Sequence, residues 1–267
     1  MKNSIKLQAI PRFYDNISFE INIENNVITE AKCMANQYSS ADRLLIGKNI
    51  NEAVHLLPRL SSENSIAHSV AITSAISNIA SIKDNRSRDD LQNILLSLSF
   101  LYNHIYHFYL CALFDYIDFN SLLSYRGKDY RIAHLKEIYM SRKSDFFGIL
   151  PKEKNLKKRK ESYFVSNDSM NFEFILGYFD ALEVLALIQD LIVLWGGRSI
   201  HVMSLLPGGV TKPITKKDIE YSRKKIIKII QFINKIYYQH LIALANEFPK
   251  YFGIGQFNNM LSFGTII

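Results

Sequence analysis

The sequence predicts a mainly α fold with a small β unit at the N-terminus, and two patterns of apolar residues support this prediction. Residues 17–32 turn at a pair of asparagines, and the first strand alternates polar residues with apolar Ile17, Phe19, Ile21 and Ile23. From residue 62 onward, apolar residues instead recur every three or four positions, which indicates helices. The 267 residues are 48% hydrophobic and 21% charged, as in a packed protein. We expect one domain over residues 1–267, with the β unit in 1–35 and a helical core in 36–267.

The first two predicted helices cover residues 62–82 and 88–117. The first is rich in alanine, isoleucine and serine, and its small residues allow close contact between helices. The second begins at Asp89 and Asp90, whose carboxylates stabilise the positive N-terminal end of a helix. Residues 91–114 have no formal charge, but their Gln, Asn, Ser and His side chains would be costly in lipid. We therefore expect a buried helix there and not a membrane span.

Two more helices are expected over residues 170–195 and from Thr215 onward. The helix over 170–195 is apolar nearly all round, which is typical of a buried helix, and Gly196-Gly197 is a suitable C-terminal end. Thr215 and Asp218 resemble a capping box at the start of the last helix. One apolar stripe is expected to follow, made of Ile219, Ile226, Ile229, Ile233, Ile236 and Leu244.

The net charge of +7 is concentrated in two groups of basic residues, one within residues 152–160 and one within 212–228. The first group lies in a polar segment, about 144–168, that we expect to be a surface loop. Neither group accompanies a nucleic-acid-binding motif, so we interpret both as solvated surfaces and expect no nucleic-acid partner.

The two cysteines, Cys33 and Cys111, are too far apart in sequence to suggest a disulfide framework or a CxxC metal site. The N-terminal residues lead into no apolar signal segment, so we expect no signal peptide. A cytoplasmic location, or the cytoplasmic face of a membrane complex, is the expectation, with membrane contact only through partners.

Several segments, in order along the chain, resemble the large subunit of nickel–iron hydrogenases. Arg59–His68 resembles Arg-x-Cys-Gly-x-Cys-x-x-Ala-His, and residues 101–109 are similar to the His-rich run that precedes Ala-Leu-Asp-Trp in that family. Residues 196–201 and 207–211 resemble Gly-Gly-Lys-x-Pro-His and Pro-Gly-Gly-Val-Thr. Residues 259–264 resemble Asn-x-Leu-Ser-Tyr-Gly. The resemblance implies the helical-bundle fold of this large subunit.

The resemblance implies that two cysteines of the Arg59–His68 motif bind nickel and iron, yet Ser61 and Asn64 stand in their positions. Thiolates bind late transition metals strongly, whereas a hydroxyl is not ionised at neutral pH and an amide is a neutral, hard donor. The family's second cysteine pair would lie beyond Ile267, and we expect it to be missing. We therefore predict no metal, no cofactor and no catalytic residue.

The remaining frame of these motifs is retained, and we interpret it as mainly structural. The resemblance places it in the shell around the metal site or in packed helices. Its members are Arg59, His68, His104, His107, His201, Pro207, Gly208 and Gly209.

The resemblance leads to three functional hypotheses. The favoured one is a non-catalytic structural or assembly component, a maturation scaffold, in a hydrogenase-type redox complex. Its expected partners are an iron–sulfur small subunit, a full-length large subunit or hydrogenase maturation proteins. The first alternative is a component of an active nickel-dependent hydrogenase whose metals another chain binds. The second is a metal-free quinone-site or membrane-complex subunit of the complex I type.

Overall fold

The computed structural model describes residues 2–7, 17–35, 41–60, 64–83, 86–142, 164–254 and 259. The chain divides into two compact units, Met1–Ala53 and Val54–Ile267. The expected single domain over residues 1–267 stays a prediction. The surface loop expected over 144–168 also stays a prediction, because residues 144–163 lie outside the described part of the chain.

The N-terminal unit contains an antiparallel sheet in the order β1 (Lys2–Leu7), β2 (Ile17–Glu24) and β3 (Val27–Ala35), and helix α1 (Ala41–Leu45). The predicted hairpin is confirmed: Asn25 and Asn26 form the turn with φ of 50° and 64°. Positive φ at both turn residues matches the right-handed twist of the strands, and asparagine tolerates it well. Strand β1 was not predicted, because its six residues lack a clear alternation.

One face of this sheet is apolar because the strand register aligns the apolar residues. Ile21 pairs with Ile5 on one side and Ala31 on the other, and Ile23 pairs with Ile28 across a bulge. The exposed fraction is 45% for Ile5 and 60% for Ile28. A small sheet generally needs its apolar face packed against another element to be stable. The sheet by itself provides no such packing for this face.

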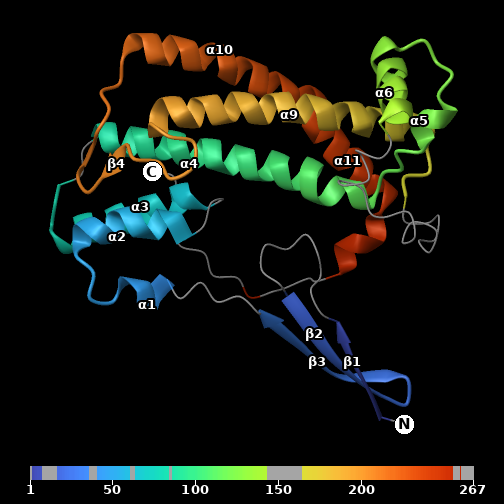
Figure 1. Cartoon of the computed structure of the whole chain (residues 1–267), viewed down its shortest axis with the longest axis horizontal. Helices are drawn as coiled ribbons and strands as arrows, with labels where there is room; N and C mark the ends of the chain where they lie inside the picture. Colours follow the sequence, from blue (N-terminus) through green and yellow to red (C-terminus); the bar gives the residue numbers. More distant parts are fainter. Residues whose placement is uncertain are drawn as a thin grey trace. The chain divides into compact units, whose positions relative to one another are not determined.

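The second unit is a stack of helices (Figure 1). Helix α9 (Asp168–Gly196) packs between α4 (Arg86–Tyr106) and α10 (Lys216–Phe232), and α3 (Ser65–Ile79) packs on α4. Two short helices, α5 (Ser121–Ser124) and α6 (Tyr130–Ser141), contact one end of α9. Helix α2 (Ile50–Leu56) and the 3-10 turn η1 (Leu57–Leu60) precede α3, and the short hairpin of β4 (Leu205–Leu206) and β5 (Gly209–Val210) lies against α3 and α4. The mainly α fold class is confirmed; the chain is not all-α, because it contains the strands β1 to β5.

Helix α9 forms the centre of the core, as its apolar sequence predicts. The side chains of Phe174, Ile175, Ala181, Ile188 and Leu191 are completely buried. The Asn167 side chain accepts hydrogen bonds from the backbone N–H groups of Ser169 and Met170 and so caps the N-terminus. At the other end, Gly197 adopts the left-handed conformation with φ of 75°, which confirms the predicted C-terminal stop.

The helix predicted over residues 88–117 is confirmed as far as Tyr106 and then changes its geometry. A π-helical turn, η2 (His107–Ala112), and a 3-10 turn, η3 (Leu113–Asp115), continue the chain. A second π-helical turn, η5 (Ile233–Tyr237), joins α10 to α11 (Tyr238–Glu247), and a 3-10 turn, η6 (Pro249–Gly253), follows. Tyr109 of η2 contacts Tyr237 of η5, with 6.1 Å between the ring centroids.

The last predicted helix begins where the capping residues indicate, but its apolar stripe is only partly buried. Thr215 is the N-cap of α10, and its Oγ1 accepts a hydrogen bond from the Asp218 N–H and donates one to the Asp218 carboxylate. Ile229 is buried against α9, whereas Ile219 and Ile226, at the start of the predicted stripe, are 45% and 41% exposed. Within the described ranges, every helix is too short or too polar to span a bilayer.

Candidate functional site

The first candidate position lies at the N-terminus of α3. Asn64 is the N-cap residue, with φ of −99° and ψ of 17°, and its side chain does not cap the helix. Its carbonyl oxygen accepts a hydrogen bond of 3.0 Å from the His68 N–H. Asn64 is exposed. Ser61, the other predicted ligand position, lies outside the described residues.

The chemistry of this position does not fit the nickel–iron group that the sequence resemblance implies. That group requires thiolates, and the amide of Asn64 is a neutral oxygen or nitrogen donor. The two cysteines lie on other elements, Cys33 exposed on β3 and Cys111 half-buried in η2. Among the residues that the structure describes, no group of three or more His, Cys, Asp or Glu side chains is placed to bind a metal ion.

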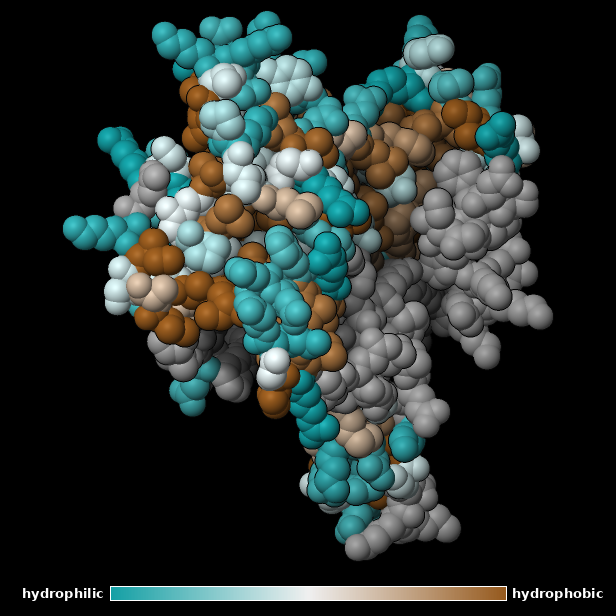
Figure 2. Space-filling model, turned by 60° about the vertical axis from the view of Figure 1, so that its left-hand side comes forward, coloured by the Kyte–Doolittle hydropathy of each residue, from teal (hydrophilic) through white to brown (hydrophobic). Residues whose placement is uncertain are grey.

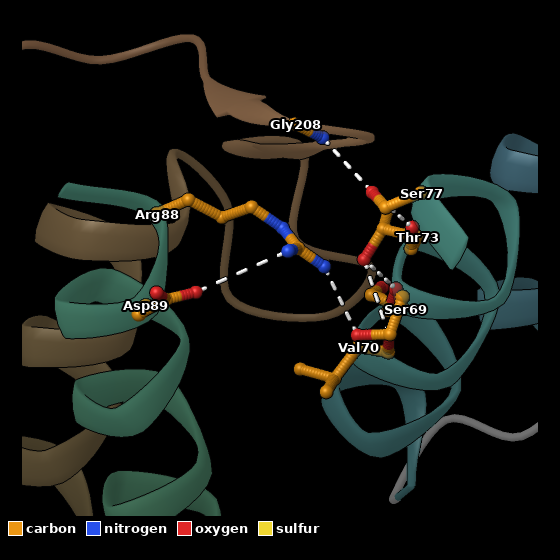
Figure 3. A network of polar contacts seen from close by, with 8 residues as sticks. Ser69, Val70, Thr73, Ser77, Arg88, Asp89 and Gly208 are labelled. Carbon is orange, nitrogen blue, oxygen red and sulfur yellow. Dashed lines mark hydrogen bonds and ion pairs between the residues drawn. The ribbon is translucent and has the colours of Figure 1, made fainter. Parts of the chain in front are cut away.

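A ladder of hydroxyl side chains follows along the buried face of α3 (Figure 3). Ser69, Thr73 and Ser77 each donate a hydrogen bond to the carbonyl oxygen four residues earlier, at 2.9, 2.7 and 2.9 Å. Each hydroxyl oxygen keeps lone pairs that can accept a further hydrogen bond. The small side chains therefore offer acceptors to a neighbouring segment without taking up much space.

The loop after α9 uses two acceptors of this face. The His201 N–H donates to Ser65 Oγ at 3.1 Å, and the Gly208 N–H donates to Ser77 Oγ at 3.0 Å (Figure 3 shows the second). His201 Nδ1 lies 3.0 Å from the carbonyl oxygen of Pro58. Because a carbonyl oxygen only accepts hydrogen bonds, Nδ1 carries the proton there. The predicted frame residues His201 and Gly208 are therefore anchored to α3 and η1.

The Pro207-Gly208-Gly209 segment forms the tight turn of the β4–β5 hairpin. Gly208 has φ of 72°, and a Cβ there would lie 2.4 Å from Ile82 Cγ2. Both the backbone conformation and the close approach require glycine at this position. Gly209 pairs with Leu206 across the hairpin.

The other predicted frame residues lie on different elements. The Arg59 guanidinium donates a hydrogen bond of 2.7 Å to the carbonyl oxygen of His55, near the C-terminus of α2, where carbonyls lack helical partners. His68 is half-buried in α3. His104 and His107 are exposed near the end of α4, where the His104 ring lies 4.2 Å from that of Phe100, centroid to centroid. The structure brings His201 to α3, which carries His68, whereas His104 and His107 lie at the end of α4 and the start of η2.

Three polar features of the core were not predicted from the sequence. The four-residue spacing of Ser65, Ser69, Thr73 and Ser77 marks the hydroxyl ladder and was visible in the sequence. Arg88 at the start of α4 is 3% exposed and donates a hydrogen bond of 3.0 Å to Ser74 Oγ, with the Asp89 carboxylate at 3.9 Å (Figure 3).

The third unpredicted feature is a buried pair of titratable groups. Tyr109 and His240 form a hydrogen bond of 2.9 Å between the phenol oxygen and Nδ1. Burial lowers the pKa of His240 to about 4, against a smaller raising effect of Asp180, and burial raises the pKa of Tyr109. The imidazole is therefore neutral near pH 7. No local sequence signal connects these two residues, which are 131 positions apart.

Comparisons with known proteins agree with this architecture. A family model for nickel-dependent hydrogenases matches residues 41–267. The large subunit of the periplasmic [NiFeSe] hydrogenase of Desulfomicrobium baculatum is 22% identical over 267 residues, covering 99% of this chain and 47% of that subunit. The quinone-reactive Ni/Fe-hydrogenase large chain of Wolinella succinogenes is 24% identical over 293 residues, covering 100% and 50%.

Solved structures share the fold. The Ni-Fe-Se hydrogenase of Desulfovibrio vulgaris Hildenborough in the reduced state superposes with a TM-score of 0.75 at 20% identity, covering 96% of this chain and 47% of that one. The chain thus spans about half the length of the curated relatives it matches. Because the family model matches residues 41–267, which is most of the chain, the chain belongs to the nickel-dependent hydrogenase family.

Proposed function

We propose that this chain is a non-catalytic large-subunit homologue that acts as a structural or assembly component of a hydrogenase-type redox complex. The observation that supports this proposal most directly is the amide of Asn64 at the N-cap of α3, a position that the motif resemblance assigns to a metal-binding cysteine. An amide does not replace a thiolate that bridges two metals. The chain keeps the fold of the family and lacks this part of its metal chemistry.

The bonds of the retained frame residues favour a structural role. Arg59 holds the end of α2, and His201 and Gly208 hold the loop after α9 against α3. Hydrogen bonds of this kind fix the positions of helices and loops, and they explain why these residues remain useful without a metal.

Exposed apolar side chains support a role in a complex. Figure 2 shows apolar surface interspersed with polar surface. On α10, Ile219, Ile226 and Ile230 are 45%, 41% and 50% exposed. Their spacing of seven and four residues places them on one side of the helix. Apolar surface of this kind often marks a protein interface. The proposed partners are an iron–sulfur small subunit, a full-length large subunit or maturation proteins, and a cytoplasmic location remains part of the proposal.

The first experiment tests the absence of catalysis. The native complex, purified through a tag on this chain, is assayed for nickel and for hydrogen-dependent dye reduction. We expect Asn64→Ala to leave both unchanged, because the amide binds no metal. The matched control is Asn78→Ala, an exposed asparagine at the other end of α3. A loss of nickel in the Asn64 variant alone would contradict the proposal and favour a subunit of an active hydrogenase.

The second experiment tests the role in a complex. Mass spectrometry identifies the proteins that copurify with the tagged chain, and size-exclusion chromatography with light scattering gives the mass of the assembly. We expect a stable complex with a hydrogenase subunit or a maturation protein. Purification of the chain as a stable monomer, without hydrogenase-related partners, would refute this part of the proposal.

A further inference from the structure

Helix α10 carries a row of exposed residues beside the face that packs on α9. The packed face contains Ser222, Ile229 and Phe232, which are buried. The exposed row, which we call the α10 seam, consists of Lys216, Ile219, Arg223, Ile226 and Ile230. Helix α10 is an outer helix of its unit (Figure 1), so α9 covers only one of its sides.

The spacing within the α10 seam is that of a contact between two helices. Its members follow one another at alternating intervals of three and four residues. This pattern averages 3.5 residues, the repeat at which one helix stays in contact with another along its length. Ile219, Ile226 and Ile230 are 45%, 41% and 50% exposed, so much of their apolar surface faces water. Rows of this kind are the anchors by which amphipathic helices bind.

Arg223 gives the α10 seam a specific chemical requirement. It lies between Ile219 and Ile226 in the row, and it has neither an ion pair nor a hydrogen bond with any residue that the structure describes. A guanidinium stays protonated in proteins. A buried charge is costly unless a counter-charge pairs with it. Whatever covers the α10 seam must therefore bring a carboxylate to Arg223.

The charge of α10 argues against a second copy of the chain as the occupant. The helix contains six basic and two acidic residues. One of the two acidic residues, Asp218, already accepts a hydrogen bond from Thr215 and lies 3.8 Å from Lys212 Nζ. Two such helices would bring like charges together, which is unfavourable at an interface. An acidic partner fits this surface better.

The shape of the apolar surface argues against a lipid bilayer. A helix that lies in a membrane interface buries a broad apolar face. Next to the α10 seam, the outer side of the helix is instead mainly polar, with Glu220, Lys224 and Gln231 exposed and only Ile227 apolar. The exposed apolar surface is thus a narrow row, which matches a helix and not a flat bilayer.

We propose that the α10 seam binds an amphipathic helix of a partner subunit, whose apolar residues pack on Ile219, Ile226 and Ile230 and whose Asp or Glu carboxylate pairs with Arg223. Guanidinium–carboxylate pairs are frequently bidentate, so this pair fixes the register of the two helices. The inference rests on the proposed role in a hydrogenase-type complex and specifies the surface and chemistry of the contact.

The first test uses the native complex, purified through a tag on this chain. Quantitative mass spectrometry gives the amount of copurified hydrogenase-related subunit for the parent, Arg223→Glu and Ile226→Ser. We expect at least about a tenfold loss in Arg223→Glu, because two carboxylates then meet at the contact, and a smaller loss in Ile226→Ser. The controls Arg86→Glu and Ile79→Ser, at exposed positions of α4 and α3, are expected to match the parent. Circular dichroism verifies that each variant is folded.

A crosslinking experiment tests for the carboxylate directly. Arg223→Lys keeps the positive charge, so it is expected to retain the partner. Carbodiimide joins lysine amines to carboxylates in direct contact, and in this variant it is expected to join position 223 to an Asp or Glu of the partner subunit. Crosslinks from this position to residues of the same chain alone would overturn the proposal.

The outcomes separate this inference from the proposed function. Equal amounts of partner subunit in the parent, Arg223→Glu and Ile226→Ser would overturn the inference and leave the role in a complex standing. A parent preparation without any hydrogenase-related subunit would refute that role and the inference with it. Binding to vesicles of phosphatidylcholine and phosphatidylglycerol, or a dimer of the chain, that is lost in Arg223→Glu would assign the α10 seam to lipid or to a second copy and would also overturn the inference.

Discussion

Replacement of Gly177 by alanine tests whether the buried contact between α9, η2 and α11 controls stability. An added Cβ would lie 2.4 Å from His240 Cε1, 2.8 Å from His240 Nδ1 and 3.2 Å from Tyr109 Cε1. These atoms belong to side chains that are 8% and 0% exposed and that share a hydrogen bond, so neither can move away freely. The substitution therefore forces the Tyr109–His240 pair apart.

The expected change in stability is the sum of one stabilising effect and two destabilising effects. Alanine is favoured over glycine in a helix by about 1 kcal/mol. Overpacking of a core costs about 1–3 kcal/mol, and loss of a buried hydrogen bond costs about 1–3 kcal/mol. We expect a net loss of about 3 kcal/mol in the free energy of unfolding. For a domain of this size, this loss lowers Tm by about 6–12 °C.

Thermal and urea unfolding of the purified protein measure this loss. The control is Gly253→Ala, because a Cβ at Gly253 would meet nothing within 4 Å, and its expected effect is within about 0.5 kcal/mol. In the double variant Gly177→Ala/His240→Ala, the imidazole that the added Cβ would strike is absent. The double variant should therefore lose less stability than the sum of the losses of the two single variants. A Gly177→Ala protein as stable as the parent, or more stable, would refute the packing explanation and leave helix propensity as the dominant effect.

Three further predictions concern titration, loop anchoring and helix capping. Burial lowers the pKa of His240 from about 6.5 to about 4, so the stability that its neutral imidazole contributes is present above pH 6.5 and is lost as the pH falls to 4. The free energy of unfolding should therefore fall by about 3 kcal/mol between pH 6.5 and pH 4. The same pH dependence in His240→Phe as in the parent protein would contradict this. Ser77→Ala removes the acceptor of the Gly208 N–H, so hydrogen exchange at this amide should accelerate and stability should fall by about 1–2 kcal/mol; unchanged exchange would show that the bond is unimportant. Thr215→Ala should lower the free energy of unfolding by about 1 kcal/mol because the N-cap is lost, whereas Thr215→Ser should retain the N-cap. Urea unfolding followed by circular dichroism measures both variants, and equal losses in the two would show that capping is irrelevant.

The long elements were predictable because local signals mark them. The helix that became α9 is apolar all round and ends at Gly197, and α10 begins at the capping residue Thr215. Short elements such as β1, α5 and α6 were not predicted, since a few residues give too little periodicity. They form because neighbouring parts of the chain pair with them or pack on them.

The candidate site was predictable from the sequence only in part. The motif resemblance predicted that Asn64 stands in place of a thiolate, and it singled out His201 and Gly208. It did not reveal that these two residues bind the hydroxyl ladder of α3, because the contacts join positions 131 or more apart in the chain. Periodicity placed Ile219 and Ile226 on the apolar stripe of the last helix, but it does not show how much of that stripe another helix covers, and both side chains are partly exposed.

By itself, the sequence determined the mainly α class and the positions of the long helices, and its motif resemblance predicted a lost metal ligand at Asn64. These features depend on residue type and on neighbours within a few turns. Only the tertiary structure decided the π-helical turns, the buried Tyr109–His240 pair and the bonds of His201 and Gly208 to α3. Each of these arises where segments distant in sequence pack together, and close packing, which no local pattern records, fixes which polar groups find partners.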